Sequence, residues 1–244
     1  MNHAYWQASR SPRYSLLFAI PLLAFYQALA AAVPAGPHGG VRNGADVLLQ
    51  AVFVWLAGSW GPRLFMACLI VAGLWFVAKD LRANPGRLRA PFFGLMLGEA
   101  IGLALVFGIV VGGLTAALLG APPPLTLIAG VQTQLSRGTI LMLSLGAGIY
   151  EELLFRVLLV GFLAWVGRRV LGFRPIIAGT SATIAGALIF SAFHYIGPYG
   201  DPWQLYSFVF RTIAGLFFSA LYLARGFGIT AWTHALYDVF LVFR

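Results

Sequence analysis

The sequence contains few charged residues and almost no cysteine. Only 9% of its 244 residues are charged, against about 25% in an average soluble domain, and 60% are hydrophobic. A soluble protein of this size needs a polar coat that this composition does not supply, so we expect lipid around most of it. The lone Cys68 excludes a disulfide framework and a CxxC metal site.

Acidic residues are also scarce, with 7 Asp and Glu against 16 Lys and Arg. The basic residues gather in short gaps between apolar runs, which is typical of the cytoplasmic loops of a membrane protein. The larger set comprises Arg10, Arg13, Lys79, Arg82, Arg87, Arg89, Arg168, Arg169, Arg174 and Arg225, and the opposite loops hold mainly Arg42, Arg63 and Arg137. We therefore predict no nucleic-acid partner, a cytoplasmic N-terminus and a C-terminus on the outer side.

Long apolar runs predict an all-α fold, a polytopic membrane bundle of about seven to eight helices. A span needs about 20 mostly apolar residues. The runs lie at 14–34, 62–79, 91–119, 138–166, 175–195, 204–224 and 227–243, and the shorter run 45–58 is expected to lie at the interface. The first run exceeds the roughly 7–15 apolar residues of a signal peptide, so we favour a retained span. No repeat or soluble segment divides the chain, which we treat as one domain, 1–244.

Ionisable side chains interrupt these apolar runs. Such groups are costly in a membrane and are functional candidates by default. The set at or within the predicted spans is Glu99, Glu151, Glu152, Arg156, His194, Arg211, His234 and Asp238. Glu99 has no obvious partner in the sequence, and we expect a structural role for it.

The stretch "EELLFR" places two glutamates and an arginine in one span. Glu152 and Arg156 are four residues apart, so on an α-helix they face one another and can form an ion pair. Glu151 would point about 100° away, since the helix has 3.6 residues per turn. It would then be unpaired and available as a general base. The alternative is a buried packing network formed by all three side chains.

Two histidines and an aspartate lie in later spans. His194 ends the fifth span, and His234 shares a helix face with Asp238, four residues further on. Taken singly, they could be a helix cap and an internal polar pair. Gathered with Glu151 in one buried polar cavity, between the membrane midplane and its outer half, they would satisfy one another. Arg211, with Tyr195, is a candidate for substrate binding; a snorkelling arginine is the alternative.

These residues carry a resemblance to a known family. "EELLFR" resembles the EExxxR motif, "FSAFH" resembles FxxxH, and "HALYD" resembles HxxxN/D, in the order found in the CPBP family of CAAX proteases and bacteriocin-processing enzymes. The resemblance covers about 135–243, which we take as the catalytic core. It extends to the Ras-converting CAAX endopeptidase and to bacterial glutamic members, and it implies an intramembrane endopeptidase.

The resemblance also implies roles for the site residues. Glu151 and His194 would activate water, His234 and Asp238 would stabilise the oxyanion or position the water, and Glu152 and Arg156 would orient the first group. Better-studied members often have Asn at the position of Asp238, and an anionic Asp would repel an oxyanion. Asp238 would then be protonated, orient His234 or bind a metal.

The sequence also bears on the cofactor, the substrate and the location. We favour a metal-free mechanism, with Glu151, His194 and His234 as the ligand set if zinc is used. The expected substrate is a membrane-embedded or lipid-anchored protein or peptide, cleaved at a C-terminal tail or sorting signal, and the expected location is a bacterial inner membrane. The rival functions are a transporter or proton relay, built on the same buried acid and base groups, and a non-catalytic scaffold.

Overall fold

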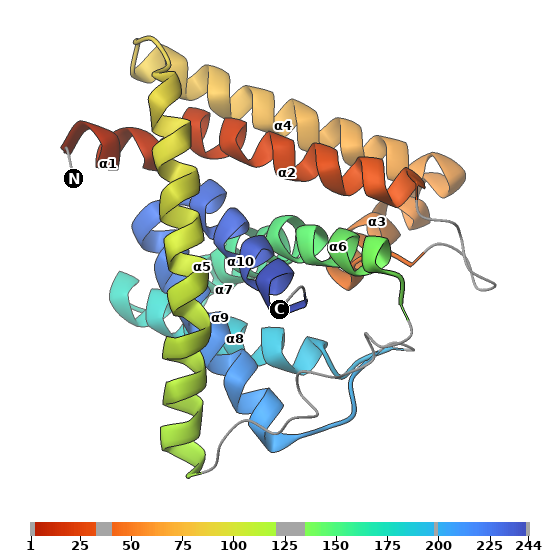
Figure 1. Ribbon diagram of the computed structural model, residues 1–244. Coiled ribbons are helices and arrows are strands. Elements are labelled where there is room, and N and C mark those ends of the chain that lie inside the picture. Colours follow the sequence, from red (N-terminus) through yellow and green to blue (C-terminus); the bar gives the residue numbers. More distant parts are fainter. Residues whose placement is uncertain (1–2, 33–40, 121–134, 198–199, 243–244) are drawn as a thin grey trace.

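The computed structural model describes residues 3–32, 41–120, 135–197 and 200–242 and is all-helical within them (Figure 1). The predicted fold class is therefore confirmed. The elements are α1 (His3–Arg10), α2 (Pro12–Ala32), α3 (Gly44–Ala57), the 3₁₀-helix η1 (Gly58–Trp60), α4 (Gly61–Ala83), α5 (Ala90–Leu119), α6 (Arg137–Gly146), the π-helix η4 (Ala147–Val160), α7 (Gly161–Arg169), α8 (Pro175–Phe193), α9 (Leu205–Arg225) and α10 (Phe227–Val242).

The outer surface of these helices is apolar. Trp55 is 84% exposed and Ile109 is 77% exposed, which would be unfavourable over such a wide area in water and is expected in lipid. Five helical segments are long and apolar enough to cross a membrane: 12–32, 44–83, 90–119, 175–193 and 205–225. The protein is therefore an integral membrane protein.

The helix boundaries follow the predicted spans within a few residues. The predicted span 138–166 is one helical run made of α6, η4 and α7, and the last predicted span corresponds to the 16-residue α10. The run 45–58 forms α3, whose 14 residues measure about 21 Å, less than the roughly 30 Å of a bilayer core. The orientation of the chain in the membrane stays a prediction.

Helix α10 lies at the centre of the bundle and packs against α2, α5, α6, η4 and α9. Small buried residues on α10, such as Ala231 and Ala235, let its neighbours approach closely. A Cβ added to Gly148 of η4 would lie 2.3 Å from the carbonyl oxygen of Ala231, so only glycine fits there. This close approach brings η4 and α10 together at the polar side chains.

Glu99 lies in a closed cluster at the junction of α1, α5 and α9. Arg225 donates to both oxygens of Glu99, at 2.5 and 2.7 Å, and the Tyr5 hydroxyl donates to Oε2 at 2.6 Å. Arg225 also donates to Ser9 Oγ at 2.9 Å and stacks on Trp6. The expected structural role of Glu99 fits this arrangement, which holds α1 on the bundle.

One pocket lies between α2, α5 and α10, and it is apolar. Its lining includes Leu17, Phe18, Phe93, Leu97 and Trp232. It does not include the ionisable residues of η4, α8 or the C-terminal half of α10. The buried polar cavity expected from the sequence therefore stays a prediction.

Candidate active site

The π-helix η4 carries the pair of glutamates and Arg156. The sequence prediction assumed α-helical geometry here and was wrong on this point, because residues 147–160 have the wider π turn. Such turns are rare and frequently occur at functional sites. Glu151 and Glu152 are 7% and 0% exposed, so both carboxyl groups are removed from solvent.

The predicted pair of Glu152 and Arg156 is present. Arg156 Nη1 lies 3.2 Å from Glu152 Oε1, and the guanidinium lies over the rings of Phe190 and Phe218, 4.4 and 5.4 Å from their centroids. These ring faces attract a cation and partly replace water around it. Neither Nη atom of Arg156 has a hydrogen-bond partner among the described residues.

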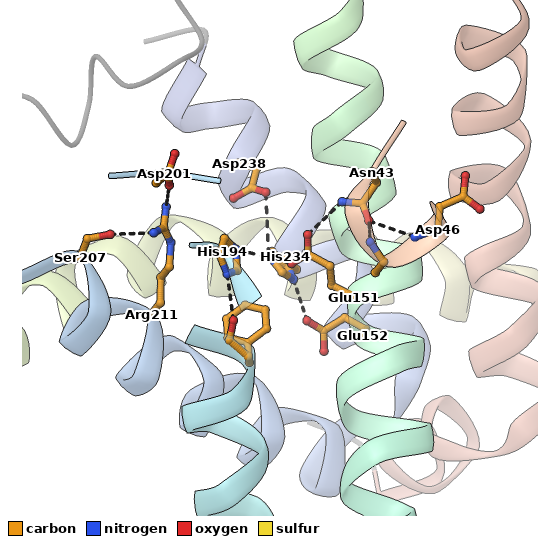
Figure 2. A network of polar contacts seen from close by, with 12 residues as sticks. Asn43, Asp46, Glu151, Glu152, His194, Asp201, Ser207, Arg211, His234 and Asp238 are labelled. Atoms are coloured by element: carbon orange, nitrogen blue, oxygen red, sulfur yellow. Dashed lines mark hydrogen bonds and ion pairs between the residues drawn. The ribbon is translucent and has the colours of Figure 1, made fainter. Parts of the chain in front are cut away.

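Glu152 also contacts α10. Its Oε1 lies 2.6 Å from Nδ1 of His234, and the imidazole stacks on Phe218 at 4.4 Å. On the other side of the ring, His234 Nε2 lies 3.8 Å from Asp238 Oδ2. The two carboxyl groups thus hold the imidazole between them, as Figure 2 shows.

Glu151 faces the end of α8. Its Oε2 lies 4.0 Å from Nε2 of His194 and has no hydrogen-bond partner among the described residues. His194 Nδ1 lies 2.9 Å from the carbonyl oxygen of Phe190. A carbonyl only accepts hydrogen bonds, so Nδ1 carries the proton and Nε2 is left as an acceptor.

The structure thus brings Glu151, Glu152, His194, His234 and Asp238 together from η4, α8 and α10 (Figure 2). These elements were the three motif-bearing spans of the sequence. A further contact to Glu151 comes from Asn43, whose Nδ2 donates to Glu151 Oε1 at 2.9 Å. The orienting role assigned to Glu152 and Arg156 stays a prediction.

Arg211 and Tyr195 lie in a neighbouring cluster. Arg211 pairs with Asp201 and donates to Ser207 Oγ at 2.7 Å, and its guanidinium lies 5.4 Å from the centroid of the Tyr195 ring. The backbone of Asp201 donates to the carbonyl oxygen of His194 at 2.9 Å. This cluster therefore adjoins the site at His194.

Sequence reasoning missed Asn43 and Asp46. Asp46 is fully buried and accepts hydrogen bonds from Tyr26, Arg42 and Gln50. The signal was present as "RNGAD", a helix-capping asparagine followed by an acidic residue in the first turn of an apolar helix. The short length of 45–58 suggested an interfacial segment and drew attention away from its start.

The zinc set suggested from the sequence, Glu151, His194 and His234, stays a prediction. Within the described ranges, no group of three or more His, Cys, Asp and Glu side chains is arranged to hold a metal ion. The Nδ1 atoms of both histidines are engaged, by Phe190 and Glu152.

The fold and these side chains together define a membrane protein with acid and base groups buried within its bundle. Residues 133–240 match the family model described as "Type II CAAX prenyl endopeptidase Rce1-like". The match confirms the resemblance seen in the sequence over residues 133–240, and it supports a CAAX-type intramembrane endopeptidase in general terms. No curated protein and no solved structure matches the chain.

Proposed function

We propose that the protein hydrolyses a peptide bond in a membrane-anchored protein or peptide, with water activated by Glu151 and His194. One observation carries the proposal. Glu151 Oε2 is buried, lacks a hydrogen-bond partner among the described residues and faces the acceptor nitrogen of His194. A buried carboxylate oxygen left without a partner is costly in a structural ion pair and useful in a catalyst.

The spacing suits a water molecule. Two acceptors 4.0 Å apart can both be reached by one water oxygen at about 2.8 Å from each. Glu151 would take the proton as the water oxygen attacks the scissile carbonyl carbon. The proton would then pass to the leaving nitrogen as the C–N bond breaks, which leaves a new carboxyl group and a new amine.

His234 is suited to stabilise the oxyanion that forms during this attack. Its Nδ1 donates to Glu152, so its Nε2 is the atom that can carry a second proton and donate it as a hydrogen bond. An imidazolium between Glu152 and Asp238 would be balanced by negative charge on both sides. Asp238 would orient this ring rather than contact the oxyanion, and Arg156 would hold Glu152.

The substrate that this setting favours has a lipid or transmembrane anchor. The helices around the site present apolar side chains outward, so an anchored substrate would approach through the bilayer. Arg211 would bind a substrate carboxylate only by releasing Asp201, its partner in the free protein. We further propose a cytoplasmic N-terminus in a bacterial inner membrane.

The direct test compares the membrane proteomes of cells that carry the wild-type chain or Glu151→Gln. Glutamine keeps the shape of the side chain but cannot act as a base, so protein termini near membrane anchors should form only with the wild-type chain. Glu99→Gln is the matched control, since it also replaces a glutamate within a predicted span, on α5 and outside the candidate site. Identical termini for the wild type and Glu151→Gln, with both proteins present in equal amounts, would overturn the proposal.

Treatment with a zinc chelator tests whether cleavage in the same cells depends on a metal ion. Membranes treated with a zinc chelator should form the same termini at the same rate, because we propose that Glu151 works without a metal ion. Chelator-sensitive cleavage that returns on addition of zinc would support the zinc-dependent form of the protease. Flux lost in Glu151→Gln without any change in termini would favour a transporter.

A further inference from the structure

We propose that Asn43 is a positioning residue for Glu151, supplied by a part of the chain outside the matched range 133–240. The inference rests on the proposed function, because it assigns Asn43 a task in that chemistry. Its amide nitrogen donates to Glu151 Oε1 at 2.9 Å, and the side chain is 5% exposed. Figure 2 shows the amide directed at the carboxylate.

The orientation of the amide is fixed by the start of α3. Asn43 is the N-cap of this helix, and its Oδ1 accepts from the backbone N–H of Ala45 at 2.9 Å and of Asp46 at 3.4 Å. Backbone N–H groups donate, so the oxygen must face them and the NH₂ group must face away. The donor thus points at Glu151 because the acceptor caps the helix.

Asp46 anchors this capping turn to α2. It accepts hydrogen bonds from the Tyr26 hydroxyl at 2.7 Å, from Arg42 Nη1 at 2.8 Å and from Gln50 Nε2 at 2.5 Å. The carboxyl group is fully buried, and every one of these donors is close to it. The turn that carries Asn43 is therefore fixed by contacts to both α2 and α3. The Asn43 amide cannot easily rotate away from Glu151.

Gly146 gives Asn43 and Tyr26 access to the helical run that bears Glu151. A Cβ at this position would lie 2.6 Å from Tyr26 Cε2 and 2.8 Å from Asn43 Cβ. Those separations are too short for any side chain, so the glycine admits both residues. Gly146 lies five residues before Glu151, in the same helical run.

The result is an asymmetric carboxylate. One oxygen of Glu151 is held by Asn43, while the other has no partner among the described residues and faces His194. A general base works best when its free lone pair is held towards the proton that it removes. Asn43 would keep Glu151 Oε2 in that direction without occupying it.

The test uses two substitutions that separate capping from positioning. Aspartate caps a helix as well as asparagine does, but in Asn43→Asp it would place a second carboxylate against Glu151. Asn43→Ala removes both the cap and the donor. Asn84→Ala is the control, because Asn84 caps the end of α4 and its amide donates to Asp80 and not to Glu151. Two quantities are measured for each variant in the full chain. One is the rate at which the protein termini that require an active chain are formed, and the other is the thermal unfolding temperature.

We expect Asn43→Ala to form these termini about 10–100-fold more slowly, the usual effect of losing such an orienting partner. Asn43→Asp should be at least as slow, and Asn84→Ala should keep nearly the wild-type rate. If Asn43 were only a cap, Asn43→Asp would cleave at the wild-type rate, and that result would overturn the proposal.

A double-mutant cycle measured by thermal unfolding tests the contact between Asn43 and Glu151 without relying on proteolysis. Asn43→Asp should lower the unfolding temperature, and Glu151→Gln added to it should restore that temperature, since the glutamine amide can donate to the new carboxylate. Absence of this rescue would show that the two side chains are not coupled and would overturn the proposal. Rescue together with an absence of wild-type-dependent termini would instead refute the proposed function, and the positioning role with it.

Discussion

Two clusters of acidic residues occupy the bundle, a partly buried one at Glu99 and a buried one at η4, and they differ in how completely they are hydrogen-bonded. Both oxygens of Glu99 accept from Arg225, and one also accepts from Tyr5. At η4, by contrast, one oxygen of Glu151, one of Glu152 and both Nη atoms of Arg156 lack hydrogen-bond partners among the described residues. A closed cluster supports the fold, while an open one keeps polar atoms for water or substrate.

The difference has a structural cause. Glu99 meets an arginine in a bidentate arrangement, with Trp6 and Tyr5 stacked against the guanidinium, and this geometry uses both carboxylate oxygens. Arg156 has only one close oxygen and lies over two phenylalanine rings. Glu151 is thereby left to interact with Asn43 and His194.

The largest effect on stability is expected from opening the closed cluster. Arg225→Met leaves Glu99, whose side chain is 17% exposed, without its cation, and we expect a cost of about 3 kcal/mol, the lower end of the range for breaking a buried ion pair. The control is Arg10→Met, because Arg10 is exposed and its side chain donates to the Leu223 carbonyl oxygen rather than to a carboxylate. Thermal unfolding in detergent measures both variants. Equal unfolding temperatures for the two would show that the Glu99 cluster does not support the fold.

An intermediate effect is expected where η4 meets α10. Gly148→Ala would place a methyl group 2.3 Å from the Ala231 carbonyl oxygen and 2.7 Å from Ala235 Cβ, and such overpacking costs about 1–3 kcal/mol. The shift should also separate Glu152 from His234 and slow cleavage by about 100-fold, as misplacement by 1 Å does.

Gly161→Ala is the matched control for that variant. Gly161 starts α7 at the end of η4, and a Cβ there meets nothing within 4 Å. Its unfolding temperature should equal or exceed that of the wild type, because alanine favours a helix more than glycine does, and its cleavage rate should be unchanged. Should Gly148→Ala cleave at the wild-type rate, the Glu152–His234 contact would not be needed for the reaction.

The smallest effect is expected at the edge of the open cluster. Asp238 is 3.8 Å from His234 Nε2 and its side chain is 29% exposed, so Asp238→Asn keeps the shape and loses only a weakly coupled charge. Cleavage should slow by less than about tenfold, which corresponds to less than about 1.4 kcal/mol of activation free energy. A loss as complete as that of Glu151→Gln would instead make the Asp238 charge essential.

Sequence reasoning could predict the elements that local patterns specify. The apolar runs end at Gly and Pro, so the helix boundaries followed from composition. The pairing of Glu152 with Arg156 and of His234 with Asp238 followed from a separation of four residues. The motif order then indicated that η4, the end of α8 and α10 would meet, and their side chains do lie together.

The contacts that remained hidden join residues far apart in the chain. Asn43 and Glu151 are separated by 108 positions, and Glu99 and Arg225 by 126. A single sequence gives no local signal for either pair. The π-helical turn was also hidden, because the apolar residues of 147–160 fit a run of α-helix equally well.

The most direct test of the central claim is the thermal unfolding of Glu99→Gln and Glu151→Gln beside the wild-type chain. Both variants exchange a carboxylate within the helix bundle for an amide of nearly the same shape. The account predicts a clear fall in unfolding temperature for Glu99→Gln, because its arginine loses a charged partner. It predicts an unchanged or higher temperature for Glu151→Gln, because a partly unsatisfied charge is removed. A fall of equal size in both variants would contradict the division between a structural and a catalytic cluster.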